Sequence, residues 1–249
     1  MADSSFRNYS RMHVQFYNAD VSLLLDSALT ATNKSAARKF SLLDLGCGDG
    51  GIIFALHKRR LLENANEIVG VDISEDRIER LKSNLPFVKG IVADAVDVTQ
   101  LSGASFDVAI CAQLIEHVEN EHGLIAEIAR LVKPGGFAYL SSVVKRRWAV
   151  YIYFKQGSFR LDPTHLREFS SEKELLDLLT SEQFEIVRAE TRPIEFPLLE
   201  LLVRLLTVSG LARPDTEFFQ KHKRLDRLRK LRLRLPGYDT VEVLARKPK

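Results

Sequence analysis

Residues 42–51 read LLDLGCGDGG, and this stretch decides the fold. The apolar run over residues 39–45 predicts a buried strand, and residues 51–62 predict a helix. Glycines between the two allow positive φ and a close approach of backbone to ligand, and the start of a helix offers free N–H groups to an anion. Taken alone the loop is ambiguous. Gly46, Gly48 and Gly51 also satisfy the dinucleotide pattern G-x-G-x-x-G, with Asp72 about 20 residues later.

Outward from this loop, segments of strand and helix character alternate. The patterns predict further strands over 67–72, 87–93, 106–112, 137–143, 184–190 and 240–245, and further helices over 12–30, 74–84, 121–131 and 171–181. Such alternation predicts an α/β fold in which helices cover both faces of a mostly parallel sheet. Ligands of such sheets bind beyond the carboxyl ends of the strands, so the functional residues should directly follow strands.

Composition limits the class of protein. The chain has 249 residues, of which 45% are hydrophobic, enough for one large α/β domain. We find no run of 18 apolar residues and no apolar signal region near Met1. Cys47 and Cys111 give no disulfide framework, so we expect a reduced, cytoplasmic protein. The net charge of +3 is uneven: residues 221–234 carry +7, which leaves −4 for the remainder.

Two aspartates and a turn help to decide which kind of ligand the glycine loop binds. Asp72 ends the second strand, where its carboxylate can accept hydrogen bonds from two ribose hydroxyls. Asp94 ends the third strand, where it can accept from an adenine amino group. A Lys-Pro-Gly-Gly turn at 133–136 precedes the fifth strand.

With these features the chain resembles the class I S-adenosylmethionine-dependent methyltransferases, and most closely their small-molecule, ubiquinone-biosynthesis-like branch. The matching stretches are LLDLGCGDG, IVGVDIS, VADA, FDVAICAQLIEHVEN and LVKPGGFAYLSS, over about residues 40–145. The resemblance implies a three-layer, Rossmann-like sheet of seven strands with the last strand antiparallel, and S-adenosylmethionine as cofactor. It implies that the methionine part binds Asp44, Gly46, Cys47, Gly48 and Gly50, the ribose Asp72 and Ile73, and the adenine Asp94 and Ala95, while Ala112 and Gln113 lie beside the reacting methyl group.

Methyl transfer is an in-line displacement, so the protein mainly supplies alignment. We expect O-, N- or C-methylation of a small molecule, including an apolar or lipid-like one. A base helps when the acceptor is a hydroxyl or an acidic carbon. His165, in the phrase Asp-Pro-Thr-His, is the first candidate because only histidine titrates near neutrality without help, and His117 is the second. The alternative is that His165 only fixes its own loop.

No metal is expected from the sequence. Some relatives hold a divalent metal with Glu-x-x-Glu-His after the fourth strand, but this chain has Gln113 at the first position. The remaining Glu116 and His117 make a poor site by themselves. His165 could complete the site as a third ligand, but Glu116 and His117 fit equally a structural role, as a cap of the helix after the fourth strand or in orienting the loop.

We expect a single domain over 1–249. It comprises a helical lid over 1–38, a cofactor-binding core over 39–190, a helical insertion over 191–239 and the last strand over 240–249. In the lid, Arg11 is a candidate partner for the methionine carboxylate.

The insertion combines an apolar helix over 196–206 with a basic amphipathic helix over 221–234. It fits a lid over an apolar acceptor, peripheral contact with an anionic membrane, binding of RNA phosphates, or a plain packed hairpin. Nucleic acid is disfavoured because no recognition motif accompanies the basic run. Two alternatives to small-molecule methylation stay open: an RNA or protein methyltransferase that uses the basic helix, and a non-catalytic protein that binds the cofactor. The sequence predicts no oligomeric state.

Overall fold

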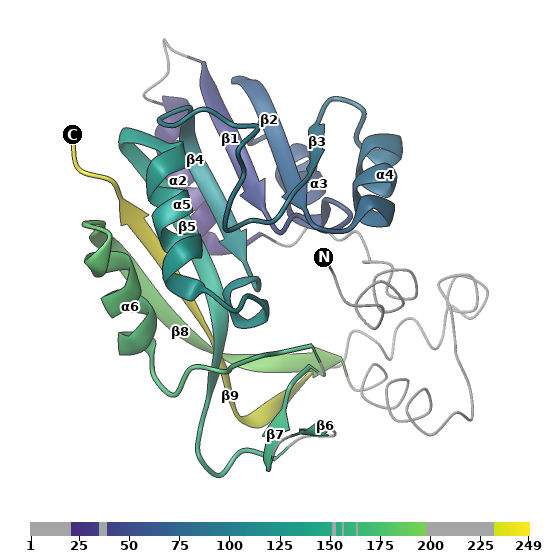
Figure 1. Ribbon diagram of the computed structural model, residues 1–249, viewed down its shortest axis with the longest axis vertical. Coiled ribbons are helices and arrows are strands. Elements are labelled where there is room, and N and C mark those ends of the chain that lie inside the picture. The colour runs from purple at the N-terminus through teal and green to yellow at the C-terminus, as the bar shows by residue number, and fades with distance from the viewer. Residues whose placement is uncertain (1–20, 35–38, 151–152, 156, 163, 198–231) are drawn as a thin grey trace.

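The computed structural model describes residues 21–34, 39–150, 153–155, 157–162, 164–197 and 232–249, and a seven-stranded sheet organises them (Figure 1). Its strands, in spatial order, are β3 (Lys89–Val92), β2 (Ala65–Asp72), β1 (Phe40–Leu45), β4 (Phe106–Ala112), β5 (Val132–Lys145), β9 (Arg232–Arg246) and β8 (Glu185–Pro197). Neighbouring strands from β3 to β5 pair in parallel, and β9 runs antiparallel to both β5 and β8. The predicted sheet, mostly parallel with an antiparallel last strand, is confirmed.

Helices cover both faces of this sheet. They are α2 (Leu23–Lys34), α3 (Gly51–Lys58), α4 (Glu75–Asn84), α5 (Glu121–Leu131) and α6 (Glu172–Ser181), with a short 3₁₀ helix η1 (Ile115–His117) after β4. Successive residues of a strand point to opposite faces, so Leu42 packs in the core under α2, α3 and α4 while Leu43 packs in the core under α5 and α6. In Figure 1, α5 and α6 lie in front of the sheet and α2 and α3 behind it. The three predicted layers are therefore present.

The glycine loop joins β1 to α3 through positive backbone angles. Gly46, Gly48 and Gly50 have φ of 72°, 55° and 89°. The backbone N–H groups of Gly46 and Cys47 both donate to the carbonyl oxygen of Val71, at 2.8 and 3.0 Å. The loop is thus held against the end of β2, in a conformation that residues with a Cβ rarely adopt.

Several predicted boundaries shift. The helix predicted over 51–62 ends at Lys58, because the chain reverses at Arg60, whose φ is 60°. Of the helix predicted over 12–30, residues 12–20 lie outside the described residues, and α2 begins only at Leu23. The predicted turn at 133–136 lies within β5, where pairing with β4 jumps from Val132 to Phe137. The intervening residues bulge out of the ladder.

The predicted helical insertion over 191–239 is wrong wherever the structure describes it. Residues 191–197 continue β8 and residues 232–239 belong to β9, so the last strand begins well before 240. The end of the predicted basic helix over 221–234 is a strand as well, because Arg232 to Leu235 alternate basic and apolar residues with the period of a strand. This segment pairs with β8 in the register Pro197↔Arg232 and Glu195↔Arg234. Residues 198–231, with the remainder of both predicted helices, lie outside the described part.

The extended ends of β8 and β9 are anchored by a small core of their own. Val143, Ala149, Leu161 and Tyr238 are buried together, and Ile194 of β8 packs against them. A hairpin of β6 (Tyr153–Lys155) and β7 (Ser158–Arg160) lies on the same side, toward which the arrowheads of β1 and β4 point (Figure 1). The extended ends of β8 and β9 and the β6–β7 hairpin therefore flank the carboxyl end of the parallel strands. Among the described residues, no helix has the length and apolar character needed to cross a membrane.

Replacing Gly50 by alanine tests the packing of the loop. A Cβ at Gly50 would lie 2.3 Å from Cδ1 of Leu81 and 2.9 Å from Cδ1 of Leu85, in addition to the strain of a φ of +89°. We expect Gly50→Ala to lower the free energy of unfolding by about 2–5 kcal/mol, the sum of left-handed strain and overpacking. Urea denaturation measures it.

Gly157→Ala is the matched control, because Gly157 has a φ of +75° but no atom within 4 Å of an added Cβ. It should cost about 1–2 kcal/mol, from backbone strain alone. Equal losses in the two variants would contradict this account of the loop.

Candidate cofactor and acceptor site

The predicted cofactor residues gather at one edge of the sheet. Asp44 lies at the end of β1 and the loop over 46–50 follows it, Asp72 ends β2, Asp94 follows β3, and Ala112 ends β4. These four strands are parallel neighbours, so their carboxyl ends lie side by side. The backbone N–H of Ala93 donates to the carbonyl oxygen of Asp72 at 3.1 Å, which joins the end of β3 to that of β2. The structure thus brings together residues that lie far apart in the sequence.

Asp44 is the most unusual group at this edge. Its side chain is buried, and its Oδ2 atom has no hydrogen-bond partner among the described residues. Burial, and next the nearby charge of Asp72, raise the pKa of Asp44 to about 8. A buried carboxyl without a partner is costly, and a cationic ligand beside it would remove that cost. The methionine part of S-adenosylmethionine carries an ammonium group and a sulfonium ion, so the residues present fit this cofactor.

Asp72 is held in place from two sides. Its two carboxylate oxygens accept hydrogen bonds from the backbone N–H groups of Gly48 and Ser74, each at 2.9 Å. Nη1 of Arg77 lies 3.9 Å from Oδ2. Burial raises the pKa of Asp72, while Arg77 and the two N–H groups oppose that rise. Each oxygen keeps a further lone pair, so the carboxylate can still accept from ribose hydroxyls as predicted.

The other predicted cofactor residues differ in what they present. Cys47 is buried, with Sγ 2.9 Å from the position a Cβ would take at Gly70, so its side chain serves packing. Asp94 is exposed and accepts a hydrogen bond from the backbone N–H of Val96 at 3.1 Å. Ile73 is 39% exposed, whereas Ala95 is buried in the core under α5 and α6. Ile73 and Asp94 are therefore accessible to a ligand.

Gln113 is bent out of regular strand geometry directly after Ala112, with a φ of 52°. In the amide orientation that satisfies both partners, it donates to Oε1 of Glu116 at 3.2 Å and accepts from the backbone N–H of Ser142 at 3.3 Å. Oε2 of Glu116 accepts a hydrogen bond from Oγ of Ser142 at 2.8 Å. Burial raises the pKa of Glu116, which is fully enclosed. The side chain of Gln113 is thus directed at Glu116.

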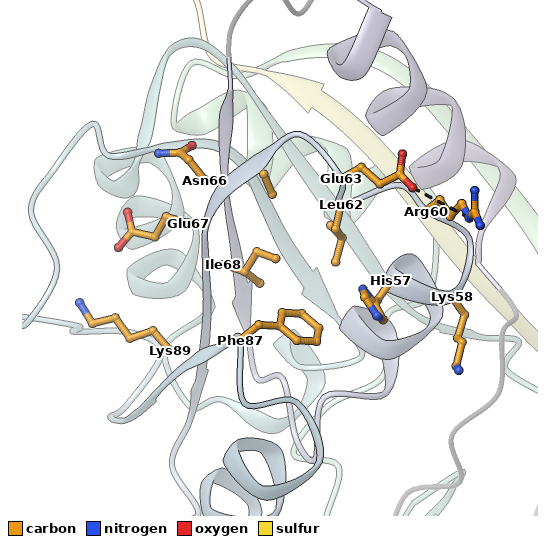
Figure 2. A pocket seen from close by; sticks show the side chains of 11 residues that line it. His57, Lys58, Arg60, Leu62, Glu63, Asn66, Glu67, Ile68, Phe87 and Lys89 are labelled. Atoms are coloured by element: carbon orange, nitrogen blue, oxygen red, sulfur yellow. Dashed lines mark ion pairs between the residues drawn. The ribbon is translucent and has the colours of Figure 1, made fainter.

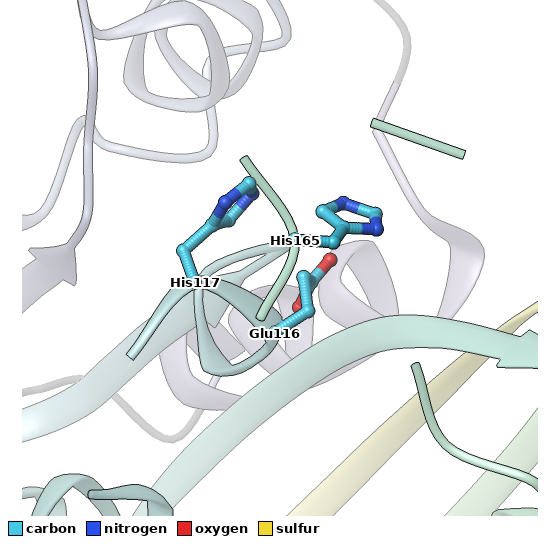
Figure 3. A group of neighbouring side chains, drawn as sticks. All are labelled: Glu116, His117 and His165. Atoms are coloured by element: carbon cyan, nitrogen blue, oxygen red, sulfur yellow. The ribbon is translucent and has the colours of Figure 1, made fainter. Parts of the chain in front are cut away.

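Glu116, His117 and His165 form one cluster beside the end of β4. Figure 3 shows the carboxylate of Glu116 pointing toward the imidazole of His165, with His117 next to it. The two imidazole centroids are 4.8 Å apart. His165 is 4% exposed, and burial together with His165 lowers the pKa of His117 to about 4. Both candidate catalytic histidines therefore lie together.

The loop that carries His165 is fastened to η1. The backbone N–H of Leu166 donates to the carbonyl oxygen of Glu116 at 2.9 Å. The guanidinium of Arg167 donates to the carbonyl oxygens of Val118 and Glu119, at 2.9 and 3.0 Å, and lies 2.7 Å from the carboxylate of Glu121. These contacts hold the loop of His165 in place next to the end of β4.

Three residues of the site were not predicted from the sequence: Arg77, and the side chains of Thr164 and Glu168 that contact the two histidines. Arg77 lies 3.9 Å from Asp72 and also interacts electrostatically with His117, so it connects the two parts of the site. A cation in the first turn of a helix is unfavourable there, which is the signal that could have marked it. Oγ1 of Thr164 lies 3.0 Å from Nδ1 of His117, and Oε1 of Glu168 lies 3.0 Å from Nδ1 of His165. The predicted lid with Arg11 lies outside the described residues.

One pocket of about 720 Å³ lies away from this site (Figure 2). His57, Ile68, Phe87 and Lys89 are among the residues that line it. His57 belongs to the end of α3, Ile68 to β2 and Lys89 to the start of β3, and Phe87 lies just before β3, so the pocket is at the amino end of the sheet. It contains none of the predicted cofactor or catalytic residues.

Comparisons with known proteins agree with the fold. Residues 43–140 match the family model described as a methyltransferase domain. Over 109 residues the chain is 36% identical to the ubiquinone biosynthesis O-methyltransferase of Neisseria meningitidis, covering 42% of this chain and 44% of that protein. The chain thus spans about half the length of the curated relatives it matches.

Solved structures extend the likeness over nearly the whole chain. A SAM-dependent methyltransferase of Methanosarcina mazei aligns with a TM-score of 0.60 at 18% identity, covering 92% of this chain and 99% of that one. The [4+2]-cyclase SpnF aligns with a TM-score of 0.59 at 22% identity, covering 95% and 88%. Such identities establish the fold alone, and the cyclase shows that this fold is not confined to one reaction. Residues 43–140 are thus similar to a methyltransferase domain, and the chain shares the fold of solved S-adenosylmethionine-dependent methyltransferases.

Proposed function

We propose that this protein transfers the methyl group of S-adenosylmethionine to a hydroxyl oxygen of a small molecule. The observation that carries the proposal is the buried Asp44 carboxyl at the end of β1, whose Oδ2 atom has no partner among the described residues. It lies beside Asp72 and close to the start of α3, so one small space offers a counter-charge for an ammonium group and N–H groups for a carboxylate. An amino acid moiety such as that of the cofactor needs both.

The choice of oxygen as the acceptor atom rests on the relatives and on the histidine cluster. The curated relatives are named as O-methyltransferases. A hydroxyl group becomes a good nucleophile only when its proton is withdrawn, and His117 and His165 lie next to the end of β4 where they can act on it. Arg77 lies 3.9 Å from Asp72, and its charge contributes to lowering the pKa of His117, which supports placing the cluster on the acceptor side of the donor site.

Cofactor binding should release a proton through Asp44. The pKa of Asp44 is raised to about 8 in the free protein, so this carboxyl is mostly protonated at pH 7. A bound ammonium group favours the charged form and lowers that pKa, so the affinity for S-adenosylhomocysteine should rise with pH, by up to about tenfold per unit, and level off above pH 8. Isothermal titration at pH 7 in phosphate and in Tris should give different binding heats, because the two buffers take up the released proton with different enthalpies. The difference should correspond to the release of nearly one proton.

Asp44→Asn is the control for this linkage. It should weaken S-adenosylhomocysteine binding and make the two buffers agree. Equal heats in both buffers for the unaltered protein would contradict the role of Asp44, and the absence of any binding would overturn the proposed function.

His165→Ala should separate methyl transfer from cofactor binding. We expect kcat to fall by about 100-fold to 10,000-fold, the usual contribution of a group that handles the acceptor proton, while S-adenosylhomocysteine binding stays unchanged. The measurement is S-adenosylhomocysteine formation with a panel of small phenols and alcohols of increasing apolar character. His57→Ala is the matched control, since His57 is an exposed histidine at the opposite end of the sheet.

Unchanged turnover in His165→Ala would remove His165 from the reaction. Cofactor binding without turnover of any member of the panel would favour the non-catalytic alternative. Neither RNA nor protein as acceptor gains support from the described residues.

We also propose that the acceptor side contacts an anionic membrane surface, which would give the protein access to an apolar or lipid-like acceptor. Trp148 and Val150 are 67% and 62% exposed, beyond the end of β5. Arg146 and the exposed Arg147 precede them, and Arg234 lies 4.0 Å from Asp239, the same carboxylate that Arg146 approaches at 3.6 Å. An exposed tryptophan among arginines suits the interface of a membrane with anionic lipids.

Vesicle sedimentation tests this contact. The protein should sediment with vesicles that contain phosphatidylglycerol and stay in solution with vesicles of phosphatidylcholine alone. Trp148→Ala, and separately Arg146→Gln with Arg147→Gln, should each reduce the bound fraction, because each removes part of the apolar or the ionic attraction. Lys173→Gln, a change at an exposed lysine of α6, should leave it unaltered. Equal sedimentation with both kinds of vesicle, or with neither, would overturn the membrane proposal.

A further inference from the structure

We propose that the pocket at the amino ends of β2 and β3 is a second binding site, which takes a small aromatic molecule with one anionic group. Its walls come from the end of α3, the turn that follows, β2 and the start of β3. Asp44 and Asp72 lie at the opposite end of the parallel strands. The pocket is therefore separate from the site proposed for methyl transfer, and neither proposal depends on the other.

The pocket is formed by backbone that is already held in place. Where the chain reverses after α3, the N–H of Arg60 donates to the carbonyl oxygen of His57 at 3.0 Å. At the start of β2, the N–H of Ala65 donates to the carbonyl oxygen of Leu62, also at 3.0 Å. The volume of about 720 Å³ lies within the range of small-molecule sites, roughly 300–1,000 Å³. A ligand would thus enter a space that does not have to be ordered first.

The centre of the pocket is apolar and aromatic. Figure 2 shows Leu62, Ile68 and Phe87 grouped there, with the imidazole of His57 beside them. The ring centroids of His57 and Phe87 are 4.8 Å apart, with an angle of 37° between the planes. Phe87 is nevertheless 45% exposed. An aromatic ligand placed on Phe87 would remove apolar surface from water and add a contact between rings.

Charged side chains surround this centre, and cations outnumber anions. The charged residues of the lining are Lys58, Arg60 and Lys89 against Glu63 and Glu67. Arg60 lies 3.9 Å from Glu63, so these two charges offset each other. Lys58 and Lys89 against Glu67 leave +1, whereas the chain outside residues 221–234 carries −4. This local excess of positive charge favours an anionic ligand over a cationic one.

Lys89 is the cation that faces the anionic group. His57 and Lys58 stand in the last turn of α3, where positive groups stabilise the end of the helix, and Nζ of Lys58 lies 5.4 Å from the ring centroid of Phe54. Lys89 is exposed at the start of β3, and no carboxylate of the described residues pairs with it. In Figure 2 it lies on the other side of Phe87 from Lys58. An anion held there avoids the negative end of α3.

Isothermal titration of the full chain with three naphthalene derivatives tests the proposal. The probes are 1-naphthoate, 1-naphthamide and 1-naphthylmethylamine, which share a ring system and differ in charge. We expect 1-naphthoate to bind most tightly, 1-naphthamide about twofold to fivefold more weakly, because an exposed ion pair contributes that much, and the amine most weakly. Addition of S-adenosylhomocysteine should leave the affinity for 1-naphthoate unchanged.

Two variants locate the ligand. Phe87→Ala should weaken 1-naphthoate binding by about tenfold, because the contact between rings is lost. Lys89→Gln should bring the affinities for 1-naphthoate and 1-naphthamide together, because it removes only the ionic attraction. The matched controls are Trp148→Ala, at an aromatic side chain that is 67% exposed, and Lys173→Gln, at an exposed lysine of α6. Both should bind 1-naphthoate as the unaltered protein does.

Four results would each overturn the second site while leaving the methyl-transfer proposal intact. They are no binding of 1-naphthoate, tighter binding of the amine, displacement by S-adenosylhomocysteine, and a preference for 1-naphthoate over 1-naphthamide that survives in Lys89→Gln. The last of these does not depend on how well Phe87→Ala folds, since Lys89 is exposed. Binding of 1-naphthoate as expected, in a protein that does not bind S-adenosylhomocysteine, would overturn the proposed function and support the second site.

Discussion

The connection between the glycine loop and the end of β2 is the constraint on which the site depends. The N–H groups of Gly46 and Cys47 share the carbonyl oxygen of Val71, and the N–H of Gly48 binds Asp72 at 2.9 Å. Positive φ at the glycines makes this close approach possible. The consequence is electrostatic: Asp44 and Asp72 are enclosed near each other, one with a free oxygen and a raised pKa. The protein retains this unfavourable arrangement where a cationic ligand would relieve it.

Charged groups near β4 and α4 connect the proposed donor and acceptor sides. Cys111, near the end of β4, feels the charges of both Asp44 and Glu116, and its pKa is raised chiefly by burial and then by these two carboxyls. Arg77 of α4 interacts with Asp72 on one side and His117 on the other. The two halves of the site are best regarded as one charged network at the carboxyl ends of parallel strands.

The core of the fold could be predicted because its signals are local. Apolar runs, the glycine loop and residues placed just after strands identify β1 to β4 and the helices between them. The extension of β8 and β9 could not be predicted, because the segment from Arg232 to Leu235 satisfies both helical and strand spacing. Only its pairing with β8 determines that it forms a strand. The proximity of His117 and His165 could not be predicted for a related reason: their rings, 4.8 Å apart, are brought together by tertiary contacts between segments that lie far apart in the sequence.

A crystal structure with bound S-adenosylhomocysteine tests the central claim most directly. We predict the ammonium group within hydrogen-bond distance of Oδ2 of Asp44, the ribose hydroxyls on Asp72, and the open side of the sulfur facing His117 and His165. The Asp44 oxygen that has no partner among the described residues would then be satisfied. A ligand bound elsewhere, or one that leaves Asp44 without a partner, would contradict the account.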